Sequence, residues 1–345
     1  MKTIFDYFKA SVIASYYETM PNDEQTFFLE YYFDNDKQYG LDLSWIKGAG
    51  STPTLLKPSN FDADPTFRDL EGFEVEGTKM PLFREGYLVK EQDRRDIMNL
   101  IDAGNGPALE LILNKVYRQI QDLILSASVT REHLRAQLFT TGKIAIAFNG
   151  VAYNYDYNLV AEQKVTPNVK WNVVATADPF ADLENWANDA QTRTGVRPTQ
   201  AVMNTATFNL IKKAEAVVAL FKDYQLGVPT NARIKDYIRT ELQLEVILYD
   251  KQYKKVKGSV AQKYIPDNIV VLTPDIKLGT TMFGVTTEED ALMREPDVNV
   301  AVVDTGVAIT TEVAKKIPYK LEIVASQIVL PTFEQGDKIV IATVV

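Results

Sequence analysis

Hydrophobic positions recur at steps of three and four between residues 107 and 138, the longest such pattern in the chain. The residues on this face are Leu109, Leu113, Val116, Ile120, Leu123, Ala127, Leu134 and Leu138. Asn105-Gly106-Pro107 before the pattern is a helix start signal, and Gly142 after it is a stop signal. The pattern predicts a helix of about 45 Å, from roughly thirty residues at about 1.5 Å each. With one apolar stripe, this helix is expected to lie along a sheet.

The segments that follow alternate between strand and helix patterns. Residues 143–160 predict an antiparallel hairpin with Asn149-Gly150 at its turn. From about residue 171 the sequence pattern is that of alternating helices and strands, and the end of the chain from residue 319 is rich in strand patterns. The predicted α/β elements are helices at 179–195, 205–221 and 234–240, strands at 199–204, 244–250 and 269–272, a basic hairpin at 251–263 and a helix capped by Thr286 and Glu289. The fold class is therefore α+β, with a long helix and hairpins flanking an inserted α/β module.

The first ninety residues contain two unusual stretches. Residues 1–40 are rich in aromatic side chains, and residues 41–90 hold many Gly and Pro residues without a helical period. Such segments require a surface to pack on, because compact domains rarely contain so long a loop without a partner. We therefore predict inter-subunit contacts at large aromatic residues of these stretches. They are Phe27, Phe28, Tyr31, Tyr32 and Trp45.

Composition limits the classes of function. The chain has 345 residues, no cysteine, and a formal net charge of −9 from 37 basic and 46 acidic residues. An acidic surface repels phosphate backbones, and the densest basic cluster, residues 251–263, is interpreted as a solvated hairpin or a docking patch for an acidic partner. We expect no disulfide framework, signal peptide or transmembrane segment, and folding in the cytoplasm.

Catalytic and metal-binding patterns fail on inspection. With one histidine, His133, and no cysteine, Cys/His zinc sites are impossible. His133 falls within the long helical pattern and is expected at a helix surface or interface. The carboxylate pairs Asp62/Asp64 and Glu74/Glu76 have the period-2 spacing of the wet face of a strand. We therefore predict no catalytic residue, no cofactor and no metal.

Two passages resemble the lambda-type major capsid (major head) protein family of tailed bacteriophages. The first is "TFFLEYYFDNDKQYGLDLSWIKG", where an aliphatic and aromatic cluster leads into an acidic break. The second is "YIPDNIVVLTPDIKLGTTMFGVTTEEDALMRE", in which Pro266, Asp267 and Asn268 match the family's signature turn before a short apolar strand. From the residues alone, this turn caps a buried strand through local side-chain bonds to the backbone, and Gly279 and Gly284 permit tight turns.

The resemblance implies a Hong Kong 97-like capsid fold with four parts. These are an N-terminal arm (1–40), an extended loop reaching over a neighbouring subunit (41–90), a peripheral domain with its spine helix at about 107–138 (91–170 and 316–345) and an axial domain (171–315). Because the arm pattern begins at the first residues, a separate scaffolding protein is expected. Lys47, Lys57 and Lys79 lie in the loop, but no feature marks any of them for a covalent cross-link.

The function implied by the resemblance is that of a major capsid protein in the virion. Pentamers and hexamers of the chain would form an icosahedral head, assembled in the host bacterial cytoplasm. The head would enclose double-stranded DNA without reading its sequence. The expected partners are the chain itself, a scaffolding protein and a portal protein, with a decoration protein left open and no membrane. Two alternatives stay open: an encapsulin-like nanocompartment shell and an α/β enzyme of unknown activity.

Overall fold

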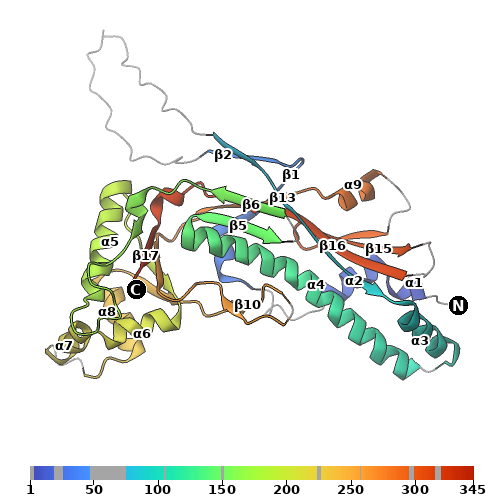
Figure 1. Cartoon of the computed structure of the whole chain (residues 1–345), viewed down its shortest axis with the longest axis horizontal. Coiled ribbons are helices and arrows are strands. Elements are labelled where there is room, and N and C mark those ends of the chain that lie inside the picture. Colours follow the sequence, from blue (N-terminus) through green and yellow to red (C-terminus); the bar gives the residue numbers. More distant parts are fainter. Residues whose placement is uncertain are drawn as a thin grey trace, which may run out of the picture. The chain divides into compact units, whose positions relative to one another are not determined.

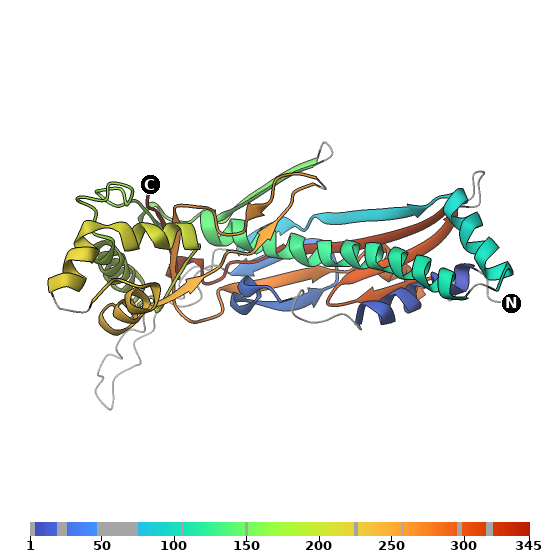
Figure 2. The same cartoon turned by 90° about the horizontal axis from the view of Figure 1, so that it is seen from below.

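The computed structural model describes residues 4–18, 26–46, 75–104, 106–148, 151–223, 227–256, 258–294, 299–314 and 320–345, and it is drawn in Figures 1 and 2. Two compact units make up the chain, each from three separate stretches. The first unit combines residues 1–43, 78–134 and 280–332, and the second combines residues 44–77, 135–279 and 333–345. The long helix α4 (Gly106–Thr141) contributes residues to both.

The first unit is a sheet with helices packed on it. Its helices, besides α4, are α1 (Ile4–Tyr7), α2 (Ala10–Glu18), the 3-10 turn η2 (Phe28–Tyr32), α3 (Glu91–Asp102) and α9 (Thr287–Arg294). Its strands are β1 (Phe33–Gln38), β4 (Leu82–Val89), β13 (Gly279–Gly284), β14 (Val300–Val303), β15 (Val307–Ala314) and β16 (Lys320–Pro331). The strand order is β1-β13-β16-β15-β14, with β4 also paired to β16.

Strand β16 is the centre of this sheet. On one side it pairs along its length with β15, in a register that sets Val324 opposite Thr310. On the other side β4 covers Leu321–Ile328 and β13 covers Ile328–Pro331. Both sides of β16 are thus hydrogen-bonded, and its residues are buried from Ala325 to Pro331. The strand-rich end of the chain, predicted from apolar runs, is confirmed here.

Helix α4 confirms the predicted long helix and extends it to 36 residues. Leu113, Ile120 and Ile124 pack in one cluster with the sheet residues Ile309 and Ile323, so the apolar stripe does lie along a sheet. Both views show α4 running along the strands β15 and β16 (Figures 1 and 2). The helix ends at Gly142, whose φ of +71° favours glycine and whose N–H donates to the Leu138 carbonyl at 2.8 Å.

The second unit is an α/β layer with three additional pairs of strands. The pairs are β2 (Asp42–Ile46) with β3 (Val75–Lys79), β5 (Lys143–Phe148) with β6 (Val151–Asp156), and β10 (Gln252–Tyr253) with β11 (Gln262–Lys263). The sheet contains, in spatial order, β7 (Lys164–Val165), β17 (Val340–Thr343), β12 (Ile269–Thr273), β8 (Gln200–Met203) and β9 (Glu245–Leu248). Its helices are η3 (Ala161–Gln163), α5 (Pro179–Thr194), α6 (Thr205–Lys213), α7 (Glu215–Asp223), α8 (Asn231–Glu241) and η4 (Gly336–Lys338).

The strands and helices of this unit occupy the predicted segments, with one difference. The helix expected over residues 205–221 is broken at Ala214 into α6 and α7. Ala214 is fully buried with ψ of 129°, and the Glu215 N–H donates to the Val174 carbonyl at 2.9 Å. A tertiary hydrogen bond thus replaces the helical one, which a periodic pattern cannot reveal.

The two compact units do not follow the expected axial and peripheral boundaries. Strands β13 and β15, expected in the axial part, pair with β16 in the first unit. Residues 333–345, expected in the peripheral part, join the second unit through β17, which pairs with β12. The assignment of axial and peripheral roles stays a prediction.

Candidate functional site

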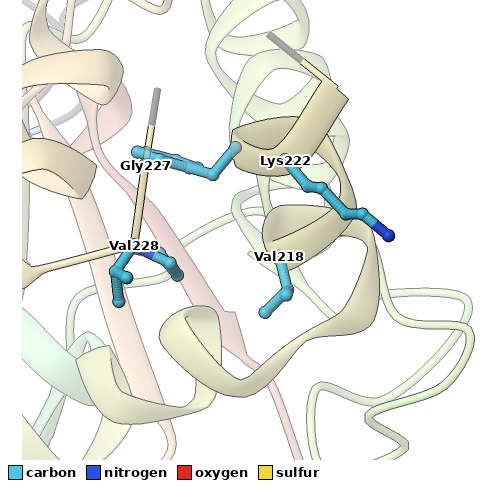
Figure 3. A pocket seen from close by; sticks show the side chains of 6 residues that line it. Val218, Lys222, Gly227 and Val228 are labelled. Atoms are coloured by element: carbon cyan, nitrogen blue, oxygen red, sulfur yellow. The ribbon is translucent and has the colours of Figure 1, made fainter. Parts of the chain in front are cut away.

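An apolar hollow lies on the described surface of the second unit. It has a volume of about 410 Å³ and is lined by Val218, Phe221, Lys222, Gly227, Val228 and Pro229 (Figure 3). Its single charged residue, Lys222, points its amine away from Val218 and Val228. An apolar lining without an acid, base or nucleophile directed into it supplies no group for catalysis.

The candidates weighed for chemistry do not meet in a site. His133 lies half-buried in α4, as its pattern predicted. Asp62, Asp64 and Glu74, and the side chain of Glu76, lie outside the described residues. Among the described residues, no group of three His, Asp or Glu side chains is placed to hold a metal ion. None of the described helices is both long and apolar enough to cross a membrane.

The aromatic arm residues divide between the interior and the surface. Phe27 and Tyr32 are buried within the chain itself, Phe28 is half-buried, and Tyr31 is 51% exposed. Tyr32 contacts the rings of Phe28 and Tyr31 edge-on, at centroid distances of 5.4 and 5.3 Å. The side chain of Trp45 lies outside the described residues. Phe27 and Tyr32 are thus packed inside the chain, and the contacts with another subunit predicted at the five aromatic residues stay a prediction.

A carboxylate of α4 holds the same arm segment in place. The Oε1 of Glu132 accepts a hydrogen bond from the Leu29 N–H at 3.1 Å, and both residues are fully buried. Such a bond fixes η2 against the helix more specifically than apolar packing alone, because a buried carboxylate needs its donors.

The neighbouring Arg131 joins three elements of the first unit. Its guanidinium is buried, contacts the carboxylate of Asp304 in the β14–β15 turn, donates to Ser128 Oγ at 2.9 Å and lies over the Phe283 ring at 5.5 Å. Burial and the charge of Asp304 raise the pKa of the nearby Tyr17 phenol in α2, and the charge of Arg131 opposes that shift. Sequence reasoning missed this cluster; its only signal is charge on or beside the apolar face of a long helix.

The predicted signature turn lies between the hairpin β10–β11 and strand β12. Asn268 adopts φ of +66°, a left-handed conformation that suits asparagine in a turn. The Asp267 carboxylate accepts bonds from Asn204 Nδ2 at 2.6 Å and Lys263 Nζ at 2.8 Å. The bond to Lys263 is the main reason that the pKa of Asp267 is lowered from its ordinary value. The turn itself is confirmed, but the expected local bonds from Asp267 to the backbone are replaced by bonds to side chains.

Asn204 is the residue that ties this turn to the rest of the second unit. It is fully buried and caps α6, with its Oδ1 accepting from the Thr207 N–H at 2.8 Å and its Nδ2 donating to the Ile265 carbonyl at 3.1 Å. Thr207 Oγ1 in turn accepts from the Asn268 N–H at 2.9 Å, and the Asn268 carbonyl accepts from the Val344 N–H at 2.9 Å. The turn is thus a structural junction, in keeping with the absence of predicted chemistry there.

The glycines after the turn do not have the role expected for them. Gly279 and Gly284 are the first and last residues of strand β13 rather than turn residues. A methyl group at Gly284 would lie 2.7 Å from Ile328 Cγ2, so the glycine permits close packing between β13 and β16.

The acidic segment after β13 is the predicted helix α9, with a partial capping box. Thr286 Oγ1 accepts from the Glu289 N–H at 3.3 Å. The Glu289 carboxylate contacts Lys37 of β1 instead of returning to the cap. Glu288 pairs with Arg84 and Asp290 with Arg294, so each acid of the first turn has a basic partner within the first unit.

A comparison with known protein families identifies the family of this chain. Residues 9–344 match the model of the family described as phage major capsid protein E. The chain belongs to this family. The match covers nearly the whole chain and supports the phage capsid interpretation over the enzyme and encapsulin-like alternatives.

Solved structures similar to this phage major capsid protein share its fold. One is a prophage protein from Escherichia coli CFT073 that has been assigned as a capsid protein, with 14% identity, a TM-score of 0.54, and coverage of 79% of this chain and 80% of the other. Another is a phage-related protein from Bordetella bronchiseptica RB50, with 12% identity, a TM-score of 0.54, and coverage of 97% and 96%. No curated protein sequence matches the chain.

The family membership confirms the predictions about general role. The chain is a phage major capsid protein with a Hong Kong 97-like fold, a structural protein of the virion that self-assembles into a shell. It is not an enzyme. This agrees with an apolar hollow that holds no catalytic group and with a signature turn whose polar residues all serve structure.

Proposed function

We propose that this major capsid protein forms pentamers and hexamers that close an icosahedral head around packaged double-stranded DNA. The observation that carries this proposal is the match of residues 9–344 to the phage major capsid protein E family. Identical chains build a closed shell when each carries heterologous interfaces whose rotation closes into rings. The acidic chain, with its net charge of −9, suits a wall that must not adhere to DNA during filling.

The arm and the loop supply part of the contact between subunits in this proposal. Residues 1–40 form the N-terminal arm and residues 41–90 the extended loop that reaches over an adjacent subunit. Tyr31, half-exposed on η2, is one of the predicted contact residues whose ring reaches the surface. Large permanent interfaces commonly bury more than about 2,000 Å², which a globular surface alone rarely provides.

Assembly in this account takes place in the host bacterial cytoplasm with a separate scaffolding protein and a portal protein. A decoration protein remains an alternative partner, and no membrane is involved. The experiment is sedimentation and negative-stain microscopy of the purified chain, with and without the proposed scaffolding protein. Closed shells or capsomer rings are the expected result, and a small monodisperse monomer in both preparations would contradict the proposal.

A further inference from the structure

The basic hairpin β10–β11 is a fixed projection of the second unit. Tyr264 stacks on Tyr249 and on Tyr253, at centroid distances of 5.9 and 4.9 Å, and these rings anchor the base of the hairpin. At the tip, Ser259 Oγ donates to the Val256 carbonyl at 2.8 Å. Both views show the hairpin extending away from α6, α7 and α8 (Figures 1 and 2).

The hairpin carries positive charge on an otherwise acidic chain. Lys263 is neutralised by Asp267 at 2.8 Å, but the adjacent Lys254 and Lys255 are exposed and form no ion pair with the described residues. Two neighbouring ammonium groups on a projecting hairpin suit an acidic partner surface, because like charges held together favour a counter-charge.

Helix α5 of the same unit carries two exposed carboxylates. The buried residues of α5 between Phe180 and Ala190 form its inner face, which packs into the core. Glu184 and Asp189 are exposed on the outer face of the helix. Neither carboxylate pairs with a described residue, while the basic side chains nearby are directed elsewhere. Arg193 donates to the Asp337 carbonyl at 2.6 Å, and Arg197 contacts Asn188 and the Leu242 carbonyl.

The two surfaces are different parts of the α/β unit. Helix α5 contacts the segment before β17, where Arg193 reaches the Asp337 carbonyl, and it contacts α8, where the Phe180 ring stacks on Tyr237 at a centroid distance of 4.9 Å. The hairpin instead leaves from the end of β9. Opposite charges on two different surfaces of one chain are what a head-to-tail contact between copies requires.

Other described acidic surfaces suit the hairpin less well. The first-turn acids of α9 each pair with a basic side chain, as described above. The acids of α3 are interleaved with Arg94 and Arg95, which would repel the lysines. Compared with α9 and α3, the outer face of α5 offers the better charge match.

We propose that Lys254 and Lys255 of one copy bind Glu184 and Asp189 of the next copy around a ring. The contact is heterologous, since two different surfaces of the same chain meet, and repeating it around an axis closes a pentamer or hexamer. This inference rests on the proposed pentamers and hexamers. Exposed ion pairs are screened by salt, so the contact selects neighbour and orientation more than it holds the ring together.

The test is a charge swap in the full chain, read as the fraction of protein that sediments as rings or shells and checked by negative stain. We expect K254E/K255E and E184K/D189K each to reduce that fraction at least about tenfold, because like charges then face each other. The variant that combines all four substitutions restores opposite charges in every contact, and we expect its assembled fraction to lie within about twofold of that of the unaltered chain. K213E/K222E changes the charge equally on exposed lysines of α6 and α7 and is expected to assemble normally.

Each remaining outcome has a defined meaning. Normal assembly of either reversal, or failure of the combination to restore it while all variants keep their far-ultraviolet spectra, would overturn the proposed contact. Loss of DNA content with intact shells in K254E/K255E would assign the hairpin to the nucleic acid and would also overturn it. Absence of rings and shells from the unaltered chain would instead contradict the proposed function.

Discussion

Asn204 shows how a single buried side chain can hold distant parts of this capsid protein together. Its side-chain amide accepts a hydrogen bond from the Thr207 N–H in the first turn of α6 and donates to the Ile265 carbonyl and the Asp267 carboxylate. The bonds to the Thr207 N–H and the Ile265 carbonyl are buried, so these two groups would lose a partner without gaining water, whereas the more exposed Asp267 carboxylate would gain it. The junction around the signature turn is therefore expected to be sensitive to one substitution.

Asn204→Ala is expected to lower the free energy of unfolding by about 2–4 kcal/mol, from the lost helix cap and the unsatisfied buried groups. Asn231→Ala is the matched control, since Asn231 is exposed and its side chain accepts a long 3.4 Å hydrogen bond from Lys212. It should change stability by less than about 0.5 kcal/mol. Urea unfolding of the unassembled chain measures both, and equal losses would contradict the role given to Asn204.

The Asp267 carboxylate should titrate below its ordinary range. Its folded-state pKa is lowered chiefly by the hydrogen bond from Lys263, so the bond stabilises the fold above the ordinary pKa and is lost as pH falls through the folded value. The side chain is 57% exposed, which limits the effect on stability to under about 1 kcal/mol. Carbon-detected NMR titration of the carboxyl group measures the pKa directly. Lys263→Ala should raise it toward the ordinary value, and an unchanged titration would refute the assigned cause.

Gly306 combines a left-handed backbone with close packing. Its φ is +80°, and a methyl group there would lie 2.6 Å from Phe283 Cδ1, whereas at Gly104, with φ of +65°, a methyl group would meet nothing within 4 Å. Gly104→Ala should therefore cost about 1 kcal/mol from backbone strain alone. Gly306→Ala should cost about 2–4 kcal/mol, because overlap adds to the strain. Thermal unfolding of the two variants separates the two effects, and equal shifts would argue against the overlap.

Sequence patterns identified the turn at Pro266-Asp267-Asn268 but not its partners. Asn204 lies far from it along the chain, and no local spacing relates the two residues. Exposure was equally hidden: Tyr31 and Tyr32 are adjacent and chemically alike, yet one is half-exposed and the other fully buried. Which ring faces the interior depends on how η2 is held by Glu132, a tertiary contact.

Among the helices and strands, α4 was the most predictable because a single period runs through it. Its end at Gly142 was also predictable, since the glycine adopts a left-handed conformation there. The break between α6 and α7 was not, because the bond from Glu215 to Val174 that causes it joins segments far apart in sequence. Helix α4 also carries buried charge at Arg131 and Glu132, which an apolar stripe does not predict.

The two faces of α4 should respond differently to truncation. Ile120 is buried against the sheet of the first unit, while Leu111 is 75% exposed. Ile120→Ala is expected to lower the free energy of unfolding by about 2–4 kcal/mol through lost packing and a cavity. Leu111→Ala should change it by less than about 0.5 kcal/mol. Denaturant unfolding of both variants makes the comparison, and a large loss at Leu111 would mean that this face is covered in the protein.

For the molecule as a whole, the order of elements along the chain predicted the α+β class, while strand pairing was beyond reach. Each compact unit combines three stretches of the chain, and β16 pairs with β4 more than two hundred residues earlier. Hydrophobic alternation predicts that a strand has a buried face but not which strand lies beside it. The resemblance carried by "TFFLEYYF" and Pro266-Asp267-Asn268 implied a phage capsid fold without specifying any strand pairing, and the family match over residues 9–344 confirmed the family.

The proposed role in a closed head is tested most directly by cryo-electron microscopy of particles assembled from this chain. The account predicts an icosahedral shell in which the chain occupies both five-fold and six-fold rings, with the hairpin β10–β11 of one copy against helix α5 of the next. A reconstruction without five-fold and six-fold rings of this chain, or particles that never close, would contradict it.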